Sequence, residues 1–244
     1  MKLKLFTLFI FAGSLCFAMT PAEIAQMYGH CIVTVNTATS KGGTFNGTGF
    51  IVTSDGLIAT NKHVVENAIF INVTFSSGLV SGQAEVISTG QDLDLALIKI
   101  NAKDLPTVIL GDSDYAPAGS EITVIGSPRR LQNTVTNGLL SQSRLMKKNI
   151  VWHQISAPIS PSSSGSPVFN TKGEVISIVF STFKGEGNQN LNFSIPSNYL
   201  KSMIAEKGYM LPDEIKPPAQ QYKGISGFFK RRWNIIKGFF GANS

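Results

Sequence analysis

The sequence has few of the residues that cross-link or charge a small protein. Its 244 residues include two cysteines, three histidines and only 15% charged residues. The formal net charge is +6, but such sparse charge does not make the dense basic stripe of a nucleic-acid-binding protein, so no nucleic-acid partner is expected. Part of this charge is local, in a basic cluster near the C-terminus made of Lys230, Arg231, Arg232 and Lys237.

The N-terminus has the three parts of a secretory signal peptide. Two lysines precede an apolar run over residues 5–18 that is short for a bilayer span, and the small Ala18 marks the expected cleavage point. A retained anchor is the alternative, whereas Leu15 directly before Cys16 disfavours a lipoprotein. We therefore expect residues 1–18 to be a signal peptide and the protein to be periplasmic or secreted.

Cleavage there removes Cys16, so no disulfide can form within the mature chain. The remaining Cys31 lies in an apolar strand pattern, which predicts an inert, buried thiol rather than a reactive one. The hydrophobic core must hold the fold without cross-links, and the chain is long enough for one protease-sized unit or two small packed barrels.

Long apolar runs are also missing, and brief ones alternate with Gly, Asn, Asp and Ser. This pattern predicts an all-β fold after one short helix over residues 21–28. The connections are too short to hold a helix between each pair of strands, which excludes parallel βαβ units. Strands are predicted over residues 32–36, 49–53, 57–60, 69–75, 84–89, 95–100, 121–126, 134–143, 150–155, 167–169, 175–180 and 191–195.

Three short patterns suggest chemistry, although each also has a structural interpretation. His63 follows a predicted hairpin, at the point where a strand ends and a helical turn begins. Asp94 stands immediately before a strongly apolar strand, where a carboxylate is costly unless it has a partner, whereas Asp92 suits a solvated strand start. Residues 160–167, Ser-Pro-Ser-Ser-Ser-Gly-Ser-Pro, are either a surface loop or a nucleophile setting with small neighbours and a stiffened turn.

Taken together, these patterns resemble the chymotrypsin-fold serine proteases, and within them the secreted DegP-like (HtrA) branch. The order His, Asp, Ser is that of the chymotrypsin fold and not of subtilisins or α/β-hydrolases. The resemblance extends over residues 47–200 and implies two packed six-stranded antiparallel β-barrels. It is carried by Gly-Thr-Gly-Phe-Ile-Val at 47–52, Thr-Asn-Lys-His-Val-Val at 60–65, Asp-Leu-Ala-Leu-Ile-Lys-Ile at 94–100, Leu-Gly-Asp-Ser-Asp at 110–114, Ile-Gly-Ser-Pro at 125–128, Thr-Val-Thr-Asn-Gly at 134–138 and Asn-Phe-Ser-Ile-Pro at 192–196.

The resemblance implies peptide-bond hydrolysis through an acyl-enzyme, with protein or peptide substrates and neither metal nor cofactor. Ser164 would be the nucleophile, because it alone of three adjacent serines precedes glycine as the family motif requires; Ser162 and Ser163 are the fallback. His63 would act as base and then acid, and Asp94 would hold its tautomer. The backbone N–H groups of Ser162 and Ser164 would stabilise the oxyanion.

Two positions depart from the family, which usually has glycine where this chain has Ser162 and Ser166. Ser162 matters more, because its N–H must point into the oxyanion hole with a backbone geometry that glycine adopts without penalty. One hypothesis is therefore that the resting hole is malformed and forms only when a substrate or partner binds. Ser166 is expected to be tolerated as a small residue behind the nucleophile.

The resemblance also indicates which stretches wall the primary specificity pocket: residues 155–159, 178–181 and 192–194. None contains an acid, which argues against cleavage after Lys or Arg. We expect a small or aliphatic residue before the cut, as in the family.

The expected protease domain covers residues 19–210, and too few residues follow it for the PDZ domain that usually accompanies the family. A Pro-rich linker is expected over 211–223, followed by a basic amphipathic tail over 224–244. Its helical pattern fits a membrane surface, or packing on the protease or a second subunit. The alternative functions are a catalytically silent protein that binds through the old cleft, and a protein that acts through this tail.

Overall fold

The computed structural model describes residues 18–127, 133–182 and 191–212. The expected signal peptide up to residue 17, all but the first two residues of the linker, and the amphipathic tail lie outside the described residues. Within the described ranges, no helix is long and apolar enough to cross a membrane.

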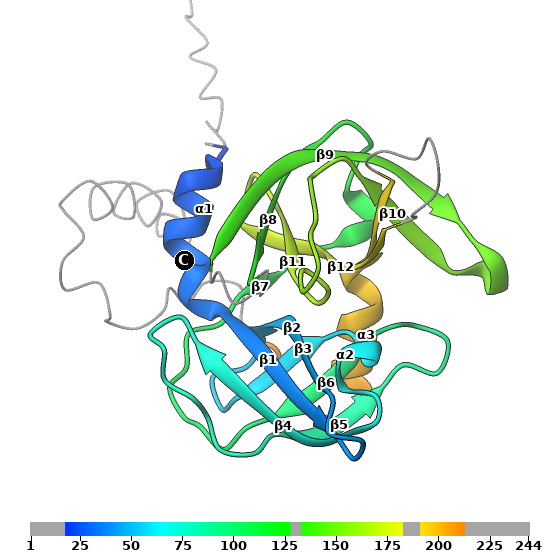
Figure 1. Ribbon diagram of the computed structural model, residues 1–244. Helices are drawn as coiled ribbons and strands as arrows, with labels where there is room; N and C mark the ends of the chain where they lie inside the picture. The colour runs from blue at the N-terminus through cyan, green and yellow to red at the C-terminus, as the bar shows by residue number, and fades with distance from the viewer. Residues whose placement is uncertain (1–17, 128–132, 183–190, 213–244) are drawn as a thin grey trace, which may run out of the picture.

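Over the described residues, two mainly antiparallel β-sheets lie one above the other in Figure 1. The first has the strand order β4-β1-β2-β3-β6-β5. Its strands are β1 (Ile32–Thr39), β2 (Thr44–Ile51), β3 (Leu57–Thr60), β4 (Ala68–Phe75), β5 (Glu85–Thr89) and β6 (Ala96–Lys99). The predicted strands of this half are all present, with ends shifted by a few residues.

The second sheet has the order β11-β8-β9-β10-β13-β12-β7, and a further β11–β12 pairing closes six of these strands into a barrel. Its strands are β7 (Ile109–Leu110), β8 (Glu121–Gly126), β9 (Thr134–Leu145), β10 (Val151–Ile155), β11 (Pro167–Asn170), β12 (Glu174–Thr182) and β13 (Asn192–Pro196). The all-β architecture of two six-stranded units is confirmed, but only the second sheet closes; the first is an open half-barrel, called the first barrel below. The short β7, which the sequence did not predict, pairs in parallel with β12 as a seventh strand.

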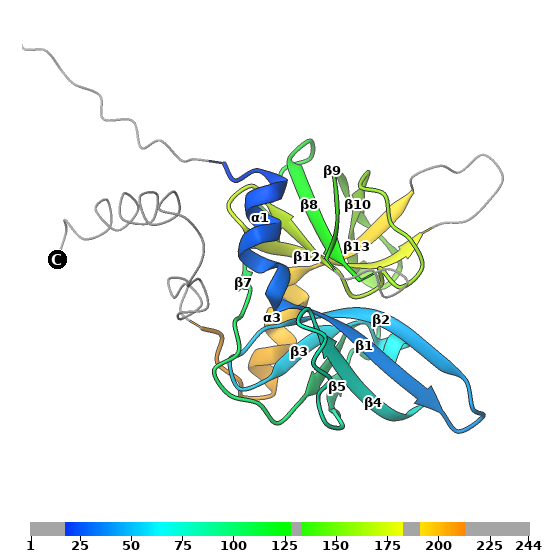
Figure 2. The same cartoon turned by 60° about the vertical axis from the view of Figure 1, so that its left-hand side comes forward.

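In the described residues, three α-helices accompany the sheets: α1 (Pro21–Tyr28), α2 (Lys62–Val65) and α3 (Ser197–Glu206). The predicted helix α1 begins at a capping box formed by Thr20 and Glu23. It runs beside the second barrel, where Tyr28 stacks on Phe169 with ring centroids 5.1 Å apart (Figure 2). The α3 helix, which follows β13 directly, was not predicted.

Alternate residues of the same strand enter different hydrophobic cores. In β3, Leu57 and Ala59 join a cluster containing residues of both sheets, α1 and α3, whereas Ile58 joins the interior of the first barrel. A third cluster fills the second barrel. Because side chains alternate across a strand, a strand between two cores is apolar on both faces. This explains the unbroken apolar run of β6 and places the shared core between the barrels.

Cys31 and His153 are buried titratable groups of this framework. Cys31 is a free thiol with no exposed surface, and burial raises its pKa, as expected for an unreactive cysteine. His153 in β10 is also buried, and its Nδ1 atom has no hydrogen-bond partner. Burial lowers the pKa of His153 to about 4, against a smaller opposing effect of Asp114.

We predict that His153 makes the fold acid-sensitive. Between pH 6.5 and 4 the unfolded chain binds a proton at this imidazole that the folded chain does not, so stability falls as pH falls through this range. The free energy of unfolding should drop by roughly 3 kcal/mol, since one pKa unit corresponds to about 1.4 kcal/mol. Urea unfolding at several pH values measures it.

The matched comparison is His153→Gln, which cannot take up the proton and should lose most of this dependence. His30, whose pKa burial also lowers, is present in both proteins and leaves a smaller slope of the same sign. Equal slopes in the two proteins would contradict the prediction.

Candidate active site

The register of two strands of the first barrel brings His63 and Asp94 together. In the antiparallel β3–β6 pair, Thr60 lies opposite Ala96. The chain leaves β3 through the buried Asn61 into α2, so residues 62–63 lie across from Asp94, which precedes β6. Asn61 Nδ2 donates to the Asp94 backbone carbonyl at 2.7 Å and fastens the two segments.

Both carboxylate oxygens of Asp94 bind His63. Oδ1 accepts the His63 backbone N–H at 2.8 Å, and Oδ2 lies 2.5 Å from the ring Nδ1. A carboxylate on Nδ1 favours the tautomer that carries its proton there and leaves Nε2 as the acceptor. The side chains are 38% and 26% exposed, so the imidazole remains accessible. The Phe45 ring meets it edge-on, with ring centroids 6.2 Å apart.

The other acid before β6 has a different place. Asp92 is exposed and forms a salt bridge with Lys148, which lies in the connection between β9 and β10. The distinction drawn from the sequence, a solvated Asp92 and a partnered Asp94, agrees with these contacts.

The serine-rich stretch forms a tight turn before Ser164. Ser163 N–H donates to the Ser160 carbonyl at 2.9 Å, as in a β-turn. Pro161 has its φ fixed near −65°, and Ser162 has φ +73°, so the turn is type II, which normally places glycine where Ser162 stands. The structure therefore confirms that serine occupies a conformation suited to glycine.

The three adjacent serines differ in their surroundings. Ser163 is buried, and its hydroxyl accepts the Ser160 N–H at 3.1 Å, so it is engaged within the turn. Ser164 is half-buried, and within the described residues its hydroxyl forms no hydrogen bond, including none to His63. Of the fallback nucleophiles, Ser163 is thus the less available.

Close packing against the first barrel brings the serine loop next to α2. A Cβ on Gly165 (φ +88°) would lie 1.9 Å from the Thr48 carbonyl oxygen, so only glycine fits after Ser164. A Cβ on Gly47 would lie 2.7 Å from Val64, the neighbour of His63, and 3.3 Å from the Ser164 carbonyl oxygen. The structure therefore places Ser164 beside the helix that carries His63.

The backbone of the loop leaves two N–H groups for a ligand. Ser163, Gly165 and Ser166 donate to the carbonyls of Ser160, Val179 and Ser163 at 2.8–3.0 Å. Within the described part of the chain, the N–H groups of Ser162 and Ser164 have no acceptor. These two are the donors that the sequence assigned to an oxyanion. The Ser166 hydroxyl, where the family has glycine, is buried without a hydrogen-bond partner.

The three predicted walls of the specificity pocket lie on neighbouring strands. Ile155 of β10 pairs with Asn192 of β13, and Val179 of β12 pairs with Ser194. Asn192 is buried, and its Nδ2 donates to the Ala157 carbonyl at 2.7 Å. No Asp, Glu, Lys or Arg occurs in these stretches.

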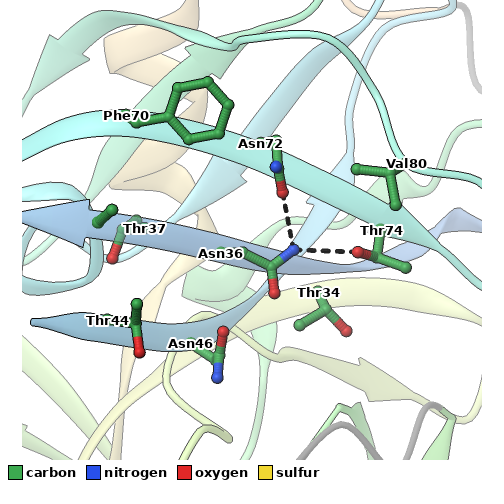
Figure 3. Close-up of a pocket in the computed structure, with 10 residues that line it drawn as sticks. Thr34, Asn36, Thr37, Thr44, Asn46, Phe70, Asn72, Thr74 and Val80 are labelled. Atoms are coloured by element: carbon green, nitrogen blue, oxygen red, sulfur yellow. Dashed lines mark hydrogen bonds between the residues drawn. The ribbon is translucent and has the colours of Figure 1, made fainter.

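A separate uncharged hollow of about 500 Å³ lies on the face formed by β1, β2 and β4 (Figure 3). Asn36 pairs in register with Asn46 and Asn72, and its amide donates to Asn72 Oδ1 and Thr74 Oγ1 at 2.9 and 3.0 Å. His63, Asp94 and Ser164 do not line it. Over residues 18–127, 133–182 and 191–212, no three His, Cys, Asp or Glu side chains cluster as metal ligands would.

Sequence reasoning missed two residues that organise the site, Asn61 and Thr48. Both lie inside motifs that carried the resemblance, but neither has a role readable from the residue type. Thr48 contacts Ser162, Ser164, Thr60 and Ser127 simultaneously. The motif Gly-Thr-Gly was the available signal, because small flanking residues permit such close approach.

Comparison with known proteins gives one consistent result. The model of the trypsin-like peptidase domain matches residues 47–178. A probable periplasmic serine endoprotease, DegP-like, of Chlamydia muridarum is 40% identical over 163 residues, 65% of this chain and 33% of its own length. Serine protease HTRA1 of Xenopus tropicalis is 40% identical over 169 residues, 66% of this chain and 36% of its own length.

Solved structures agree with these matches. The HtrA-type protease AlgW with a tripeptide has a TM-score of 0.70 and 28% identity, covering 78% of this chain and 65% of its own. A serine endoprotease from Yersinia pestis has a TM-score of 0.67 and 27% identity, covering 78% and 66%. The chain spans about a third of the length of the curated relatives it matches.

We predict that Ser162→Gly stabilises the fold. A left-handed φ costs a non-glycine residue about 1–2 kcal/mol, and the entropy that glycine loses on folding offsets only part of that. The free energy of unfolding should rise by about 0.5–1 kcal/mol, as measured by urea denaturation. The control is Ser54→Gly, at a turn serine without a positive φ, which should lower stability; a loss of stability in both variants would contradict the prediction.

Proposed function

Because the chain belongs to the trypsin-like peptidase family and is similar to its HtrA-type members, we propose that it is a serine endopeptidase acting through Ser164, His63 and Asp94. The observation that carries the proposal is the Asp94 carboxylate, which binds the backbone N–H and the ring Nδ1 of His63. Nearby, the half-buried Ser164 lies in a loop where two backbone N–H groups have no acceptor among the described residues. In the proposal, these groups serve as base, nucleophile and anion-binding site.

In the proposed reaction, Ser164 Oγ attacks the scissile carbonyl carbon while His63 Nε2 accepts the hydroxyl proton. Asp94 keeps the opposite ring nitrogen protonated and stabilises the imidazolium that forms. The carbonyl oxygen becomes an oxyanion that accepts hydrogen bonds from Ser162 and Ser164 N–H, each worth about 3–4 kcal/mol to the transition state. His63 then protonates the leaving amine, and water hydrolyses the acyl-enzyme by the reverse roles.

The same site supports a preference for uncharged residues before the cut. The stretches that the resemblance assigns to the pocket walls, residues 155–159, 178–181 and 192–194, contain no Asp, Glu, Lys or Arg. A charged substrate side chain would lose its hydration there without gaining a counter-ion.

The protein's similarity to DegP-like periplasmic endoproteases and its N-terminal pattern support a periplasmic or secreted location, with protein or peptide substrates. The solved HtrA-type relatives with bound peptides support the binding of peptide substrates. The tail over residues 224–244 remains proposed as a contact with a membrane surface or a partner.

We predict that a fluorophosphonate probe labels Ser164, as read by mass spectrometry of the purified protein. Ser164→Ala should abolish labelling and reduce casein hydrolysis by at least about a thousandfold. Asp94→Asn should reduce kcat by about 10⁴-fold, because the amide favours the wrong His63 tautomer.

The matched control is Asp92→Asn, at the exposed acid two residues away, which should leave labelling and hydrolysis nearly unchanged. An unlabelled wild-type protein, even with unfolded casein or lipid vesicles present as activators, would favour the catalytically silent alternative. Equal losses of labelling and hydrolysis in the Asp92 and Asp94 variants would contradict the proposed role of Asp94 in holding the His63 tautomer.

We predict that peptides cleaved from a mixed-sequence library carry small or aliphatic residues immediately before the cut. The measurement is mass spectrometry of the products, with Ser164→Ala as the blank. Products ending predominantly in Lys or Arg would overturn the assigned specificity.

A further inference from the structure

Thr48 is a fully buried residue of β2 that reaches across to the nucleophile loop of the other barrel. Its hydroxyl accepts the Ser127 N–H at 3.0 Å and donates to the Ser162 carbonyl at 2.8 Å. Because the N–H can only donate, the hydroxyl hydrogen is left to point at Ser162. The hydroxyl is therefore held in one orientation by its two partners.

The backbone of Thr48 makes a second contact with the same loop. Its N–H donates to the Ser164 carbonyl at 2.8 Å, while its carbonyl accepts the Thr60 hydroxyl at 2.7 Å. One residue of the first barrel thus holds the carbonyls of both Ser162 and Ser164. These carbonyls lie on either side of the peptide unit that carries the Ser164 N–H.

The two peptide units whose carbonyls Thr48 binds, 162–163 and 164–165, also donate hydrogen bonds through their N–H groups. The Ser163 N–H donates to Ser160, and the Gly165 N–H donates to Val179. The peptide unit between them is bound through the Ser163 carbonyl, which accepts the Ser166 N–H at 3.0 Å. The Ser164 N–H is consequently fixed in direction while remaining free to donate to a ligand.

We propose that Thr48 is a positioning residue for acylation, whose hydroxyl orients the peptide units around Ser164. The inference rests on the proposed function of this site. The hydroxyl is the part that substitution can remove, because the backbone bond to Ser164 survives a change of side chain. Misplacing a reacting group by about 1 Å can cost roughly a hundredfold in rate, so a loosened loop slows the chemical step more than binding.

The experiment compares Thr48→Val, Thr48→Ala and Thr48→Ser with Thr34→Val. Thr34 is the matched control: it lies opposite Thr48 in register, is also buried, and its hydroxyl bonds the Ser127 hydroxyl at 2.7 Å but no residue of the serine loop. The maximal rate of fluorophosphonate labelling at Ser164 and the probe concentration at half that rate are measured separately, together with casein hydrolysis against pH.

Thr48→Val and Thr48→Ala should lower the maximal labelling rate about 10- to 100-fold, with the half-saturating concentration changed less than about threefold. Thr48→Ser, which keeps the hydroxyl, and Thr34→Val should stay within about threefold of wild type. The shape of the pH profile should not change, because Thr48 does not contact His63 or Asp94. Circular dichroism and urea unfolding report whether each variant is folded.

Equal rate losses in Thr34→Val and Thr48→Val would overturn the proposal, because they would assign both threonines to the contact between barrels. Loss of fold together with activity in both Thr48→Val and Thr48→Ala would overturn it in favour of a purely structural role. A labelled wild type with an equally fast Thr48→Val refutes this inference alone, whereas an unlabelled wild type refutes the proposed function and this inference with it.

Discussion

The hydrogen bonds that Thr48 makes across the barrel interface are the constraint on which the candidate site depends. His63 and Asp94 belong to the first barrel, and Ser164 belongs to the second. The internal geometry of either barrel cannot set the separation of these groups. That separation is set where β2 meets the serine loop, by the bond from the Thr48 N–H to Ser164 and by the contact of Gly165 with the Thr48 carbonyl. A side chain on Gly165 would force the barrels apart and separate the nucleophile from the base.

The two serines that replace the family's glycines destabilise this loop in different ways. Ser162 adopts a left-handed φ, so its cost is local backbone strain. Ser166 has an ordinary conformation, but its hydroxyl is buried without a hydrogen-bond partner, so its cost is lost hydration. The first serine carries one of the free N–H groups, and the second lies behind the nucleophile. The expectation that Ser162 is the more serious departure stays a prediction; of the two serines, only Ser162 has a positive φ.

The sequence predicted the strands and a hydrogen-bonded partner for Asp94 because both leave local signals. Strands buried between two cores appear as apolar runs, and a carboxylate placed before such a run, as Asp94 is, must find a partner. The two-residue β7 and the helix α3 lack such signals: β7 is held by pairing with β12, and α3 follows a strand without a side-chain cap. The role of Thr48 was unreadable for a different reason, because its contact with Ser162 spans 114 residues of chain. Contacts of that range depend on how the barrels pack.

The hydrogen bonding of the loop bears on the choice between an enzyme and a silent binding cleft. In a loop that serves only packing, the backbone N–H groups would be hydrogen-bonded within the protein. A half-buried N–H without an acceptor loses hydration and gains no hydrogen bond in exchange. Here the N–H groups of Ser163, Gly165 and Ser166 are all paired, while those of Ser162 and Ser164 have no acceptor among the described residues. Maintaining a strained serine to present one of these donors adds a further cost. Such an arrangement is favoured where an acceptor with developing negative charge binds, which is the demand that acyl transfer makes.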